Sequence, residues 1–167
     1  MNAEPAIREV EPGDCPRICE LWNAFIRSSV VTFTNEERTP AGLVRFVEQK
    51  RRNGHPFLVA TVAESIVGFA TYGQFRSGPG YAHTMESTIM IEAGAQSTGT
   101  GRRLMGQLEN HARTRGVHSI FAGVSAENAG AVSFHEKCGF VRVSCLKEVG
   151  FKFGRWHDLI LLQKFLD

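Results

Sequence analysis

The chain has 167 residues, a length typical of one domain with its own core. Hydrophobic residues make up 43% and charged residues 22% of it, which is the range of ordinary globular proteins. The net charge of +2 is too small to indicate a nucleic-acid partner, and the short basic run Lys50–Arg52 is expected to be a solvated face. No apolar run nears the ~18 residues of a membrane helix, and no signal pattern opens the chain. These features predict a cytoplasmic protein without a membrane partner.

The cysteine pattern predicts free thiols and no metal site. Cys15, Cys19, Cys138 and Cys145 include no C-x-x-C pair, and no histidine stands at metal-ligand spacing. We expect partly buried thiols in a reducing compartment.

The first part of the chain is predicted to hold a strand and two helices. A strand at Ile7–Val10 is followed by a turn, and Asp14 suits the N-cap of a helix that ends near Ser28–Ser29. After a loop at 30–38, Thr39-Pro40 predicts the start of a second helix, which Asn53-Gly54 ends.

The remaining elements predict a mixed sheet flanked by helices. Two apolar segments, 57–62 and 66–72, read as an antiparallel hairpin, and a strand at 81–91 follows a glycine- and proline-rich loop. The next elements are a helix at 101–115 with Gly116 as C-cap, a strand at 118–124, a helix from Asn128 to Lys137, and strands at 140–148 and 156–165, which 149–155 connects. This order predicts an α+β protein with a mixed, mostly antiparallel sheet.

A glycine turn, Gln96–Arg103, joins a predicted strand to a predicted helix. The first N–H groups of a helix lack intrahelical partners and carry partial positive charge, so phosphates bind there. Gly99 and Gly101 have no Cβ, which would let a pyrophosphate approach the backbone. The turn fits neither the Walker loop nor the G-x-G-x-x-G dinucleotide loop. Taken alone, it also fits a plain connection between strand and helix.

The Q-x-x-G-x-G pattern of this turn resembles the pyrophosphate loop of the GNAT N-acetyltransferases. The resemblance extends to the segments Glu86–Ile91, Glu127–Phe140 and Val149–Leu159, which look like the branch that acetylates phosphinothricin and methionine sulfone or sulfoximine. It implies one GNAT-fold domain over residues 1–167, acetyl-CoA as co-substrate, no metal, and direct transfer of acetyl to the α-amine of a small amino-acid analogue. It also implies a homodimer with acceptor sites near the interface. The implied coenzyme-binding residues are Ile89, Met90, Ile91, Gln96, Ser97, Thr98, Gly99, Thr100, Gly101, Arg102 and Asn128.

Glu86 and His135 are the candidate catalytic residues. Deprotonating an α-amine of pKa about 8 at pH 7 costs only about 1.4 kcal/mol, so a modest base suffices. Glu86 matches the family's E-[SH]-[ST]-[IV]-x-[IV] motif and would accept the proton directly or through water, although an ion pair at a strand start is the alternative. Many relatives carry Tyr where this chain has His135, which would protonate the departing thiolate or hold the substrate; a core histidine bonded to a carbonyl is its alternative.

Asn128 and the backbone of residues 89–91 are further candidates for contacts with acetyl-CoA. Asn128 would contact the coenzyme as in the family, but a helix cap explains it equally well. Backbone N–H groups of 89–91 would polarise the thioester carbonyl, which a strand bulge would favour.

The acceptor is expected to be anionic. Arg76 matches a basic position that the family uses near the acceptor's acid group, with an exposed surface arginine as the alternative. Phosphinothricin enzymes carry a second basic residue two positions later, and Gly78 there favours the sulfone and sulfoximine relatives, which share His83-Thr84. Phe33 is expected either to pack or to contact substrate. The candidate acceptor-binding residues are Phe33, Arg76, Tyr81, His83, Glu86, Ser87 and Thr88.

The loop around Gln96–Thr98 lacks the Arg or Lys that relatives carry, so Arg102 or Arg103 must assist coenzyme binding. Two other functions stay open: acetylation of a peptide N-terminus or another amine metabolite, and a non-catalytic acyl-CoA-binding module. An Arg-lined closed pocket would argue against peptides, and the pair Glu86 and His135 argues against the module.

Overall fold

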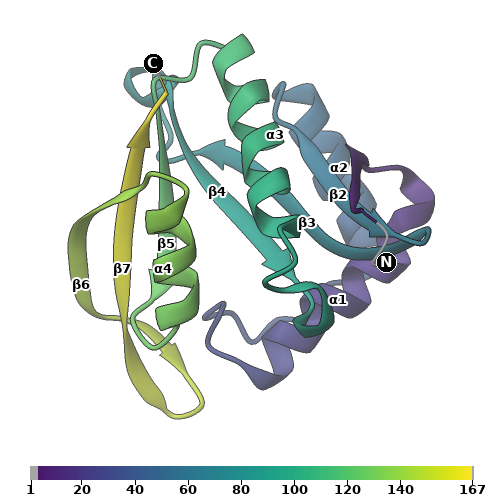
Figure 1. The fold of residues 1–167 in the computed structure, drawn as a ribbon. Coiled ribbons are helices and arrows are strands. Elements are labelled where there is room, and N and C mark those ends of the chain that lie inside the picture. Colours follow the sequence, from purple (N-terminus) through teal and green to yellow (C-terminus); the bar gives the residue numbers. More distant parts are fainter. Residues whose placement is uncertain (1–3, 167) are drawn as a thin grey trace.

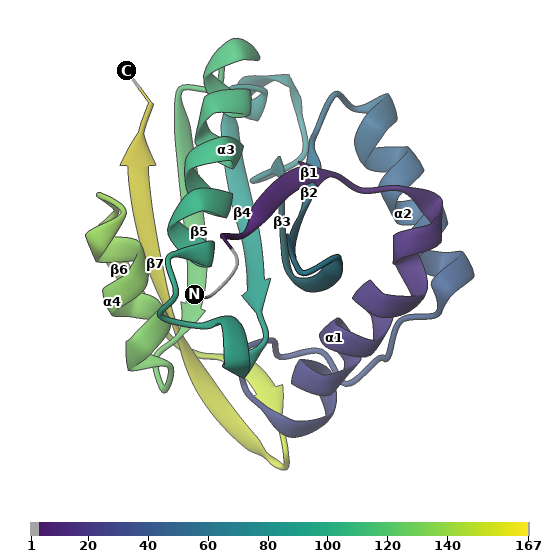
Figure 2. The same cartoon turned by 45° about the vertical axis from the view of Figure 1, so that its right-hand side comes forward.

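A computed structural model describes residues 4–166, in which seven strands form one sheet of order β1-β2-β3-β4-β5-β7-β6. The strands are β1 (Ala6–Glu9), β2 (Phe57–Val62), β3 (Ser65–Gln74), β4 (Thr84–Ile91), β5 (Ser119–Ser125), β6 (Val141–Lys152) and β7 (Arg155–Phe165). The helices are α1 (Cys15–Ser28), α2 (Pro40–Arg52), α3 (Thr100–Thr114) and α4 (Ala129–Lys137). Helices α1 and α2 cover one face of the sheet, and α3 and α4 cover the other (Figures 1 and 2). The predicted α+β fold is confirmed.

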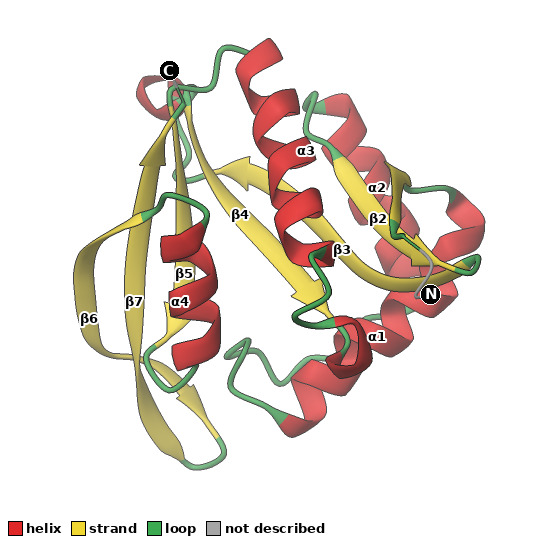
Figure 3. Ribbon diagram, viewed as in Figure 1, coloured by secondary structure: helices red, strands yellow, loops and turns green. Residues whose placement is uncertain are grey.

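The parallel pair of the sheet, β4 and β5, gives the fold its opening. Residues Thr84–Ser87 pair with Ser119–Ala122, whereas every other neighbouring pair of strands in the described chain is antiparallel. Beyond Ser87 and Ala122 the two strands no longer pair, and Figure 3 shows them diverging. The ends of β4 and β5 therefore leave backbone groups that the sheet does not use.

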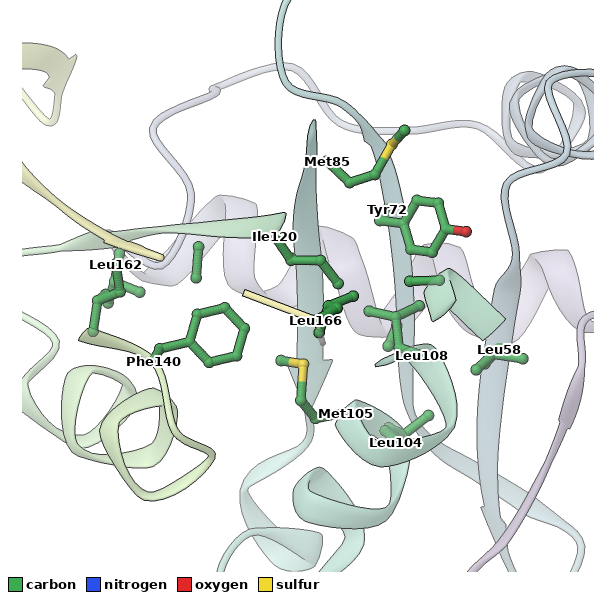
Figure 4. Packing of buried hydrophobic residues seen from close by; sticks show 14 of the residues in the cluster. Leu58, Tyr72, Met85, Leu104, Met105, Leu108, Ile120, Phe140, Leu162 and Leu166 are labelled. Atoms are coloured by element: carbon green, nitrogen blue, oxygen red, sulfur yellow. The ribbon is translucent and has the colours of Figure 1, made fainter. Parts of the chain in front are cut away.

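Two apolar clusters hold the layers together, one on each face of the sheet. Side chains of α3 such as Leu104, Met105 and Leu108 pack on strand residues including Ile120 (Figure 4). On the other face, α1 and α2 place Trp22 and their other apolar residues on the strands. Burial of these side chains is the main force that fixes the helices to the sheet.

Of the three predicted helix N-caps, two make the expected side-chain hydrogen bond. The Thr39 hydroxyl accepts the Gly42 N–H, and the Asn128 side chain accepts the Ala131 N–H. Asp14 does stand at the N-cap position of α1, but the predicted side-chain bond is absent, because its carboxylate binds the Arg8 guanidinium at 2.7 Å and accepts the Glu11 N–H at 2.8 Å instead of the N–H groups of α1. A charged donor is the stronger partner for a carboxylate than a neutral backbone N–H.

The strand limits depart from the prediction by more than two residues at two places, the start of β4 and the end of β6. Strand β4 begins at Thr84 rather than at 81, because Pro79–Tyr81 forms a 3₁₀ turn. Strand β6 continues to Lys152, so the predicted connection at 149–155 shrinks to the turn Phe153-Gly154. Glu148 takes a φ of +51° inside a register shift between Leu146 and Gly150, which lets the ladder continue past an irregular stretch.

The four cysteines are free thiols, as predicted, although Cys145 is exposed. Within residues 4–166, no helix is both long enough and apolar enough to cross a membrane.

Candidate active site

A row of unpaired backbone N–H groups lies where β4 leads into α3. The first intrahelical bond of α3 runs from the Arg103 N–H to the Gly99 carbonyl. None of the N–H groups of residues 97–102 donates to any acceptor in residues 4–166. Gly99 is the N-cap and has no side chain to satisfy them. Consecutive free N–H groups at a helix start form an anion-binding site, which fits a pyrophosphate.

The two loop glycines have different reasons to be glycine. Gly99 has a φ of +88°, a conformation that side chains rarely adopt, and open space around it. A Cβ on Gly101 would lie 2.8 Å from Ile91 Cδ1 and 3.0 Å from Phe134 Cε2. Close packing of α3 against β4 and α4 therefore gives Gly101 a reason of its own, while its role in the approach of a phosphate stays a prediction.

A cleft of about 670 Å³ runs from this row of N–H groups along the end of β4, beyond the point where β4 pairs with β5. Phe25 and Val31, which line one side of it, pack with the cluster under α1 and α2, so the cleft passes between the two strands to that face of the sheet. Its remaining lining comes from the end of β4, the glycine loop and α4: Ile89, Met90, Ile91, Gln96, Ser97, Gly99, Gly101, Arg102, Asn128, Gly130, Ala131, Ser133, Phe134, His135, Lys137 and Cys138. An elongated molecule with a phosphate end would fit this shape.

Some side chains of the glycine loop hydrogen-bond within the loop, and others line the cleft. Gln96 donates to the Ile91 carbonyl, and Thr98 donates to the Ala95 carbonyl and contacts the Thr100 hydroxyl. These bonds hold the loop in shape, whereas Thr98 and Thr100 do not line the cleft. Arg103 is paired with Glu4, but Arg102 lines the cleft without an ion pair in the described chain. Arg102 is therefore the arginine that is free to meet an anion.

Strand β4 presents backbone donors to the cleft. The Glu92 N–H donates to the Val67 carbonyl of β3, so by alternation along the strand the N–H groups of Ile89 and Ile91 point away from β3, toward the opening. The β3–β4 ladder runs without a register shift from Gly68↔Ile91 to Gln74↔Met85. The donors thus arise from the missing β5 partner, and the expected bulge is not needed.

Glu86 lies on the face of the sheet that α1 and α2 cover. It pairs with Gly73 of β3 and Phe121 of β5, and neither carboxylate oxygen has a hydrogen-bond or ion-pair partner in residues 4–166. Its Oε1 occupies space that the missing side chain of Gly123 leaves, because a Cβ there would be 3.0 Å away. The side chain still reaches solvent, but surrounding protein raises the pKa of Glu86. An unpaired carboxylate with a raised pKa suits a proton acceptor better than the alternative ion pair.

His135 is buried on α4, with the edges of Phe134 and Phe140 around its ring. Its Nδ1 lies 2.8 Å from the Ala131 carbonyl, so Nδ1 carries the proton and the neutral ring has a bare Nε2. Burial lowers the pKa of His135. A neutral ring with a bare Nε2 accepts a hydrogen bond rather than donating one, so the geometry favours the holding role over the acid role.

The predicted acceptor residues do not all gather on one face. Thr88 and Glu86 alternate to the same face, and the Arg76 guanidinium lies 5.8 Å from the ring of Phe75, which stacks on Phe121. Ser87 instead donates to the Phe121 carbonyl, and His83 Nδ1 bonds the Gly116 carbonyl at the end of α3. Tyr81 is exposed in the 3₁₀ turn. The structure thus places Arg76 and Thr88 on the side of Glu86, and turns His83 and Ser87 away from it.

Phe33 packs against the C-terminal hairpin. Its ring stacks on His157 at 5.5 Å and rests on Gly150, where a side chain would collide with it. Next to this contact, buried Lys152 donates to the carbonyls of Ser29 at 2.6 Å and Thr32 at 2.8 Å. Burial lowers the pKa of Lys152. The hairpin therefore clamps the loop between α1 and α2, and packing explains Phe33 directly.

Sequence reasoning missed several lining residues, among them Phe25, Val31, Phe134 and Lys137. Phe25 lies in the first predicted helix and Val31 in the predicted loop at 30–38, and nothing in their local pattern marks them as lining a cleft. Phe134 and Lys137 lie in the segment Glu127–Phe140, which carries the family resemblance, and that resemblance could have marked them as site residues.

Comparison with known proteins identifies the family. Residues 7–161 match the family described as "Acetyltransferase (GNAT) domain". The chain belongs to the GNAT acetyltransferases. As a GNAT N-acetyltransferase it is an acetyl-CoA-dependent acyltransferase, and the free N–H groups, Arg102 and the apolar cleft are chemically suited to a pyrophosphate and its pantetheine arm. The acetyl group is what acetyl-CoA supplies to the reaction.

Relatives of this GNAT chain cover nearly all of it. A methionine sulfoximine/methionine sulfone acetyltransferase of Salmonella typhimurium is 30% identical, over 96% of this chain and 94% of that protein. A phosphinothricin N-acetyltransferase of Streptomyces coelicolor is 32% identical, over 95% and 94%. Two solved structures superpose with a TM-score of 0.93 each. They are a ribosomal-protein-alanine N-acetyltransferase of Brucella melitensis (34% identical, 96% and 99% covered) and yncA of Salmonella typhimurium with its cofactor acetyl-CoA (30%, 98% and 94%).

Proposed function

We propose that this GNAT enzyme acetylates the α-amine of a small amino acid or amino-acid analogue by direct transfer from acetyl-CoA. The observation that carries the proposal is the unpaired carboxylate of Glu86, on the opposite side of the β4–β5 opening from α4. An amine entering from the α1–α2 face would meet Glu86 as proton acceptor and the end of the cleft as acetyl source. Relatives that act on methionine sulfoximine, methionine sulfone and phosphinothricin support this substrate class.

The raised pKa of Glu86 matches the task. A proton acceptor works best when its pKa approaches the working pH, and a carboxylate at its ordinary pKa of about 4.3 would be a weak base at pH 7. Burial supplies part of that rise. The N–H groups of Ile89 and Ile91, which point into the opening, are placed to stabilise negative charge on the acetyl oxygen. In this proposal His135 accepts a hydrogen bond at Nε2 and orients a bound group.

Within this class, the sulfone and sulfoximine of methionine are the expected acceptors. Gly78, which stands at the position of the second basic residue of phosphinothricin enzymes, has a φ of +104°. A side chain there would be strained, so the turn is built for glycine rather than for a lysine or arginine. Phosphinothricin is therefore expected to be the poorer acceptor.

The test is acetyl-CoA-dependent thiol release with a panel of amines. The panel is methionine sulfone, methionine sulfoximine, phosphinothricin, ordinary amino acids and a short peptide. The Glu86→Gln variant should lose about 10²–10⁴-fold in kcat while its affinity for acetyl-CoA persists. Glu48→Gln, an exposed carboxylate on α2, is the matched control. Equal turnover by Glu86→Gln and wild type on every amine would refute the role of Glu86.

A second candidate is acetylation of a peptide N-terminus. The superposition on a ribosomal-protein-alanine N-acetyltransferase at 34% identity favours it. A terminal alanine presents the same α-amine without a free carboxylate. Higher kcat/KM on an alanine-terminated peptide than on any amino acid of the panel would replace the first proposal with this one.

We also propose that the enzyme forms a homodimer through β6. This edge strand leaves a row of large apolar side chains half to two-thirds exposed: Val141 66%, Val143 50%, Val149 51% and Phe151 52%. Unpaired edges with apolar faces are natural interfaces. Light scattering should give twice the chain mass for the wild type and the monomer mass for Val143→Glu. A monomeric wild type at micromolar concentration would refute the dimer.

A further inference from the structure

Lys50, at the end of α2, places its ammonium on the same face of the sheet as Glu86. A Cβ on Gly73 would lie 2.8 Å from Lys50 Nζ, and Gly73 is the direct partner of Glu86 across β3 and β4. Directly paired residues have their Cβ positions roughly 5 Å apart, on one face of a sheet. Lys50 Nζ is therefore within about 8 Å of the Glu86 Cβ, on the flank opposite to Gly123, toward which the carboxylate points.

No carboxylate of the described chain forms an ion pair with Lys50. Its Nζ donates to the Tyr72 carbonyl at 2.8 Å and lies 5.0 Å from the Phe46 ring, and no ion pair involves it within residues 4–166. A second cation, Arg38, stacks on Trp22 at 3.6 Å and on the same Phe46 ring at 4.9 Å. The Arg38 guanidinium likewise has no hydrogen-bond acceptor in the described chain.

Both cations have lost water without gaining a counter-charge. Burial, with a smaller contribution from Arg38, lowers the pKa of Lys50 to about 8, so the ammonium is still mostly protonated at pH 7. Burial also lowers the pKa of Arg38. Two half-buried cations around one aromatic ring are costly unless an anion joins them, because desolvated charge needs a partner. Within the described chain these two cations have a carbonyl and aromatic rings as partners but no anion.

We propose that Lys50, backed by Arg38, binds the carboxylate of the acceptor amino acid. This assignment rests on the proposed amino-acid acetylation. An amino acid whose amine approaches Glu86 carries its carboxylate two bonds from that nitrogen, and the distance between Glu86 and Lys50 accommodates such a molecule. Gly73 makes the contact possible, because any side chain there would displace the ammonium. Arg76, which is exposed and lies 5.8 Å from the Phe75 ring, remains for the substituent of the acceptor side chain.

The test compares an amino acid with its amide, which keeps the α-amine and loses the negative charge. Both are measured as acceptors for turnover, and their binding to the enzyme with CoA is measured by calorimetry. Lys50→Met should raise KM and Kd for the acid by about tenfold or more and leave those of the amide near wild type. Lys50→Arg should recover much of the difference. Arg52→Met, which removes an exposed charge from the same helix, should change neither.

The outcomes separate this assignment from the substrate class. If the wild type acetylates amino acids but Lys50→Met weakens acid and amide equally, Lys50 only supports the fold through Tyr72 and the assignment is overturned. If Arg76→Gln weakens binding of the acid but not of the amide, and Lys50→Met has no such effect, the acceptor carboxylate binds Arg76 instead of Lys50. If the wild type neither binds nor acetylates any amino acid, the proposed function falls, and this assignment falls with it.

Discussion

Gly123→Ala probes the position of the Glu86 carboxylate without touching Glu86. The added Cβ would lie 3.0 Å from Oε1, and a carbon and an oxygen prefer at least about 3.4 Å, so the carboxylate must move by about 0.4 Å. The next neighbour, Leu159 Cδ2 at 3.5 Å, is in ordinary contact and does not resist. Gly123 has no positive φ, so alanine fits the backbone.

The expected effect follows from how steeply catalysis depends on position. A displacement of about 1 Å costs roughly 10²-fold in rate, so about 0.4 Å should lower kcat by about sixfold. The methyl group also removes water from Glu86 and should raise its pKa further, which moves the acidic limb of the kcat/KM profile to higher pH. Alanine in place of a strand glycine should not lower stability, since glycine there costs about 0.5–1 kcal/mol.

The assay is thiol release with the best acceptor of the panel from pH 5.5 to 9, with thermal unfolding measured in parallel. Gly106→Ala, where a Cβ would meet nothing within 4 Å, is the matched control and should leave the profile unchanged. A Gly123→Ala enzyme with the kcat and acidic limb of the wild type would show that the Glu86 carboxylate is not the proton acceptor at that position.

Three further predictions concern the coenzyme loop and the charge of Glu86. In urea unfolding, Gly101→Ala should lower the free energy of unfolding by about 1–3 kcal/mol, because its Cβ meets Ile91 and Phe134. Gly106→Ala in the same helix should raise it by about 0.5–1 kcal/mol. A change of the same sign in both variants would contradict the close packing around Gly101. Arg102→Gln should raise the KM for acetyl-CoA about tenfold. Arg103→Gln, which loses the pair with Glu4, should leave that KM unchanged. A raised KM in Arg103→Gln and an unchanged KM in Arg102→Gln would exclude Arg102 from the site. Because the folded state raises the pKa of Glu86, it favours the protonated form, and stability is lost as pH rises through that pKa. Glu86→Gln should therefore raise the free energy of unfolding at pH 7 but not below pH about 4 in urea titrations, and a gain at both pH values would rule out ionisation as its cause.

The candidate coenzyme half of the site could be described from the sequence because it is built from contiguous backbone. The glycine turn, the start of α3 and the end of β4 follow one another in the chain, so their residue types could be read together. Even there, the sequence could not show that Gly101 is needed for packing against Phe134, which comes from α4, or that Glu4 takes Arg103 and leaves Arg102. Those facts depend on elements that meet only in the folded protein.

The acceptor half was less predictable because strand register decides it. Alternation along β4 sends Glu86 and Thr88 to one face and Ser87 to the other, although all three belong to the matching segment Glu86–Ile91. His83, just before β4, bonds the Gly116 carbonyl instead. Lys50 looked like part of a solvated basic run, and its neighbours Arg51 and Arg52 are indeed exposed. A local pattern of charges does not reveal which member of a run points back over the sheet.

Glycines link these observations on the acceptor side. Gly73 gives space to Lys50, Gly123 to Glu86 and Gly150 to Phe33, and in each case the side chain that occupies the space comes from another element. A glycine inside a strand weakens the strand by itself, so three such positions on β3, β5 and β6 need a compensating reason. Each one lets a functional or clamping side chain approach the backbone of the sheet more closely than a Cβ would permit. If the proposed roles of Lys50 and Glu86 hold, the preference of this enzyme for its acceptor depends on these gaps in the sheet as much as on the charged groups that fill them.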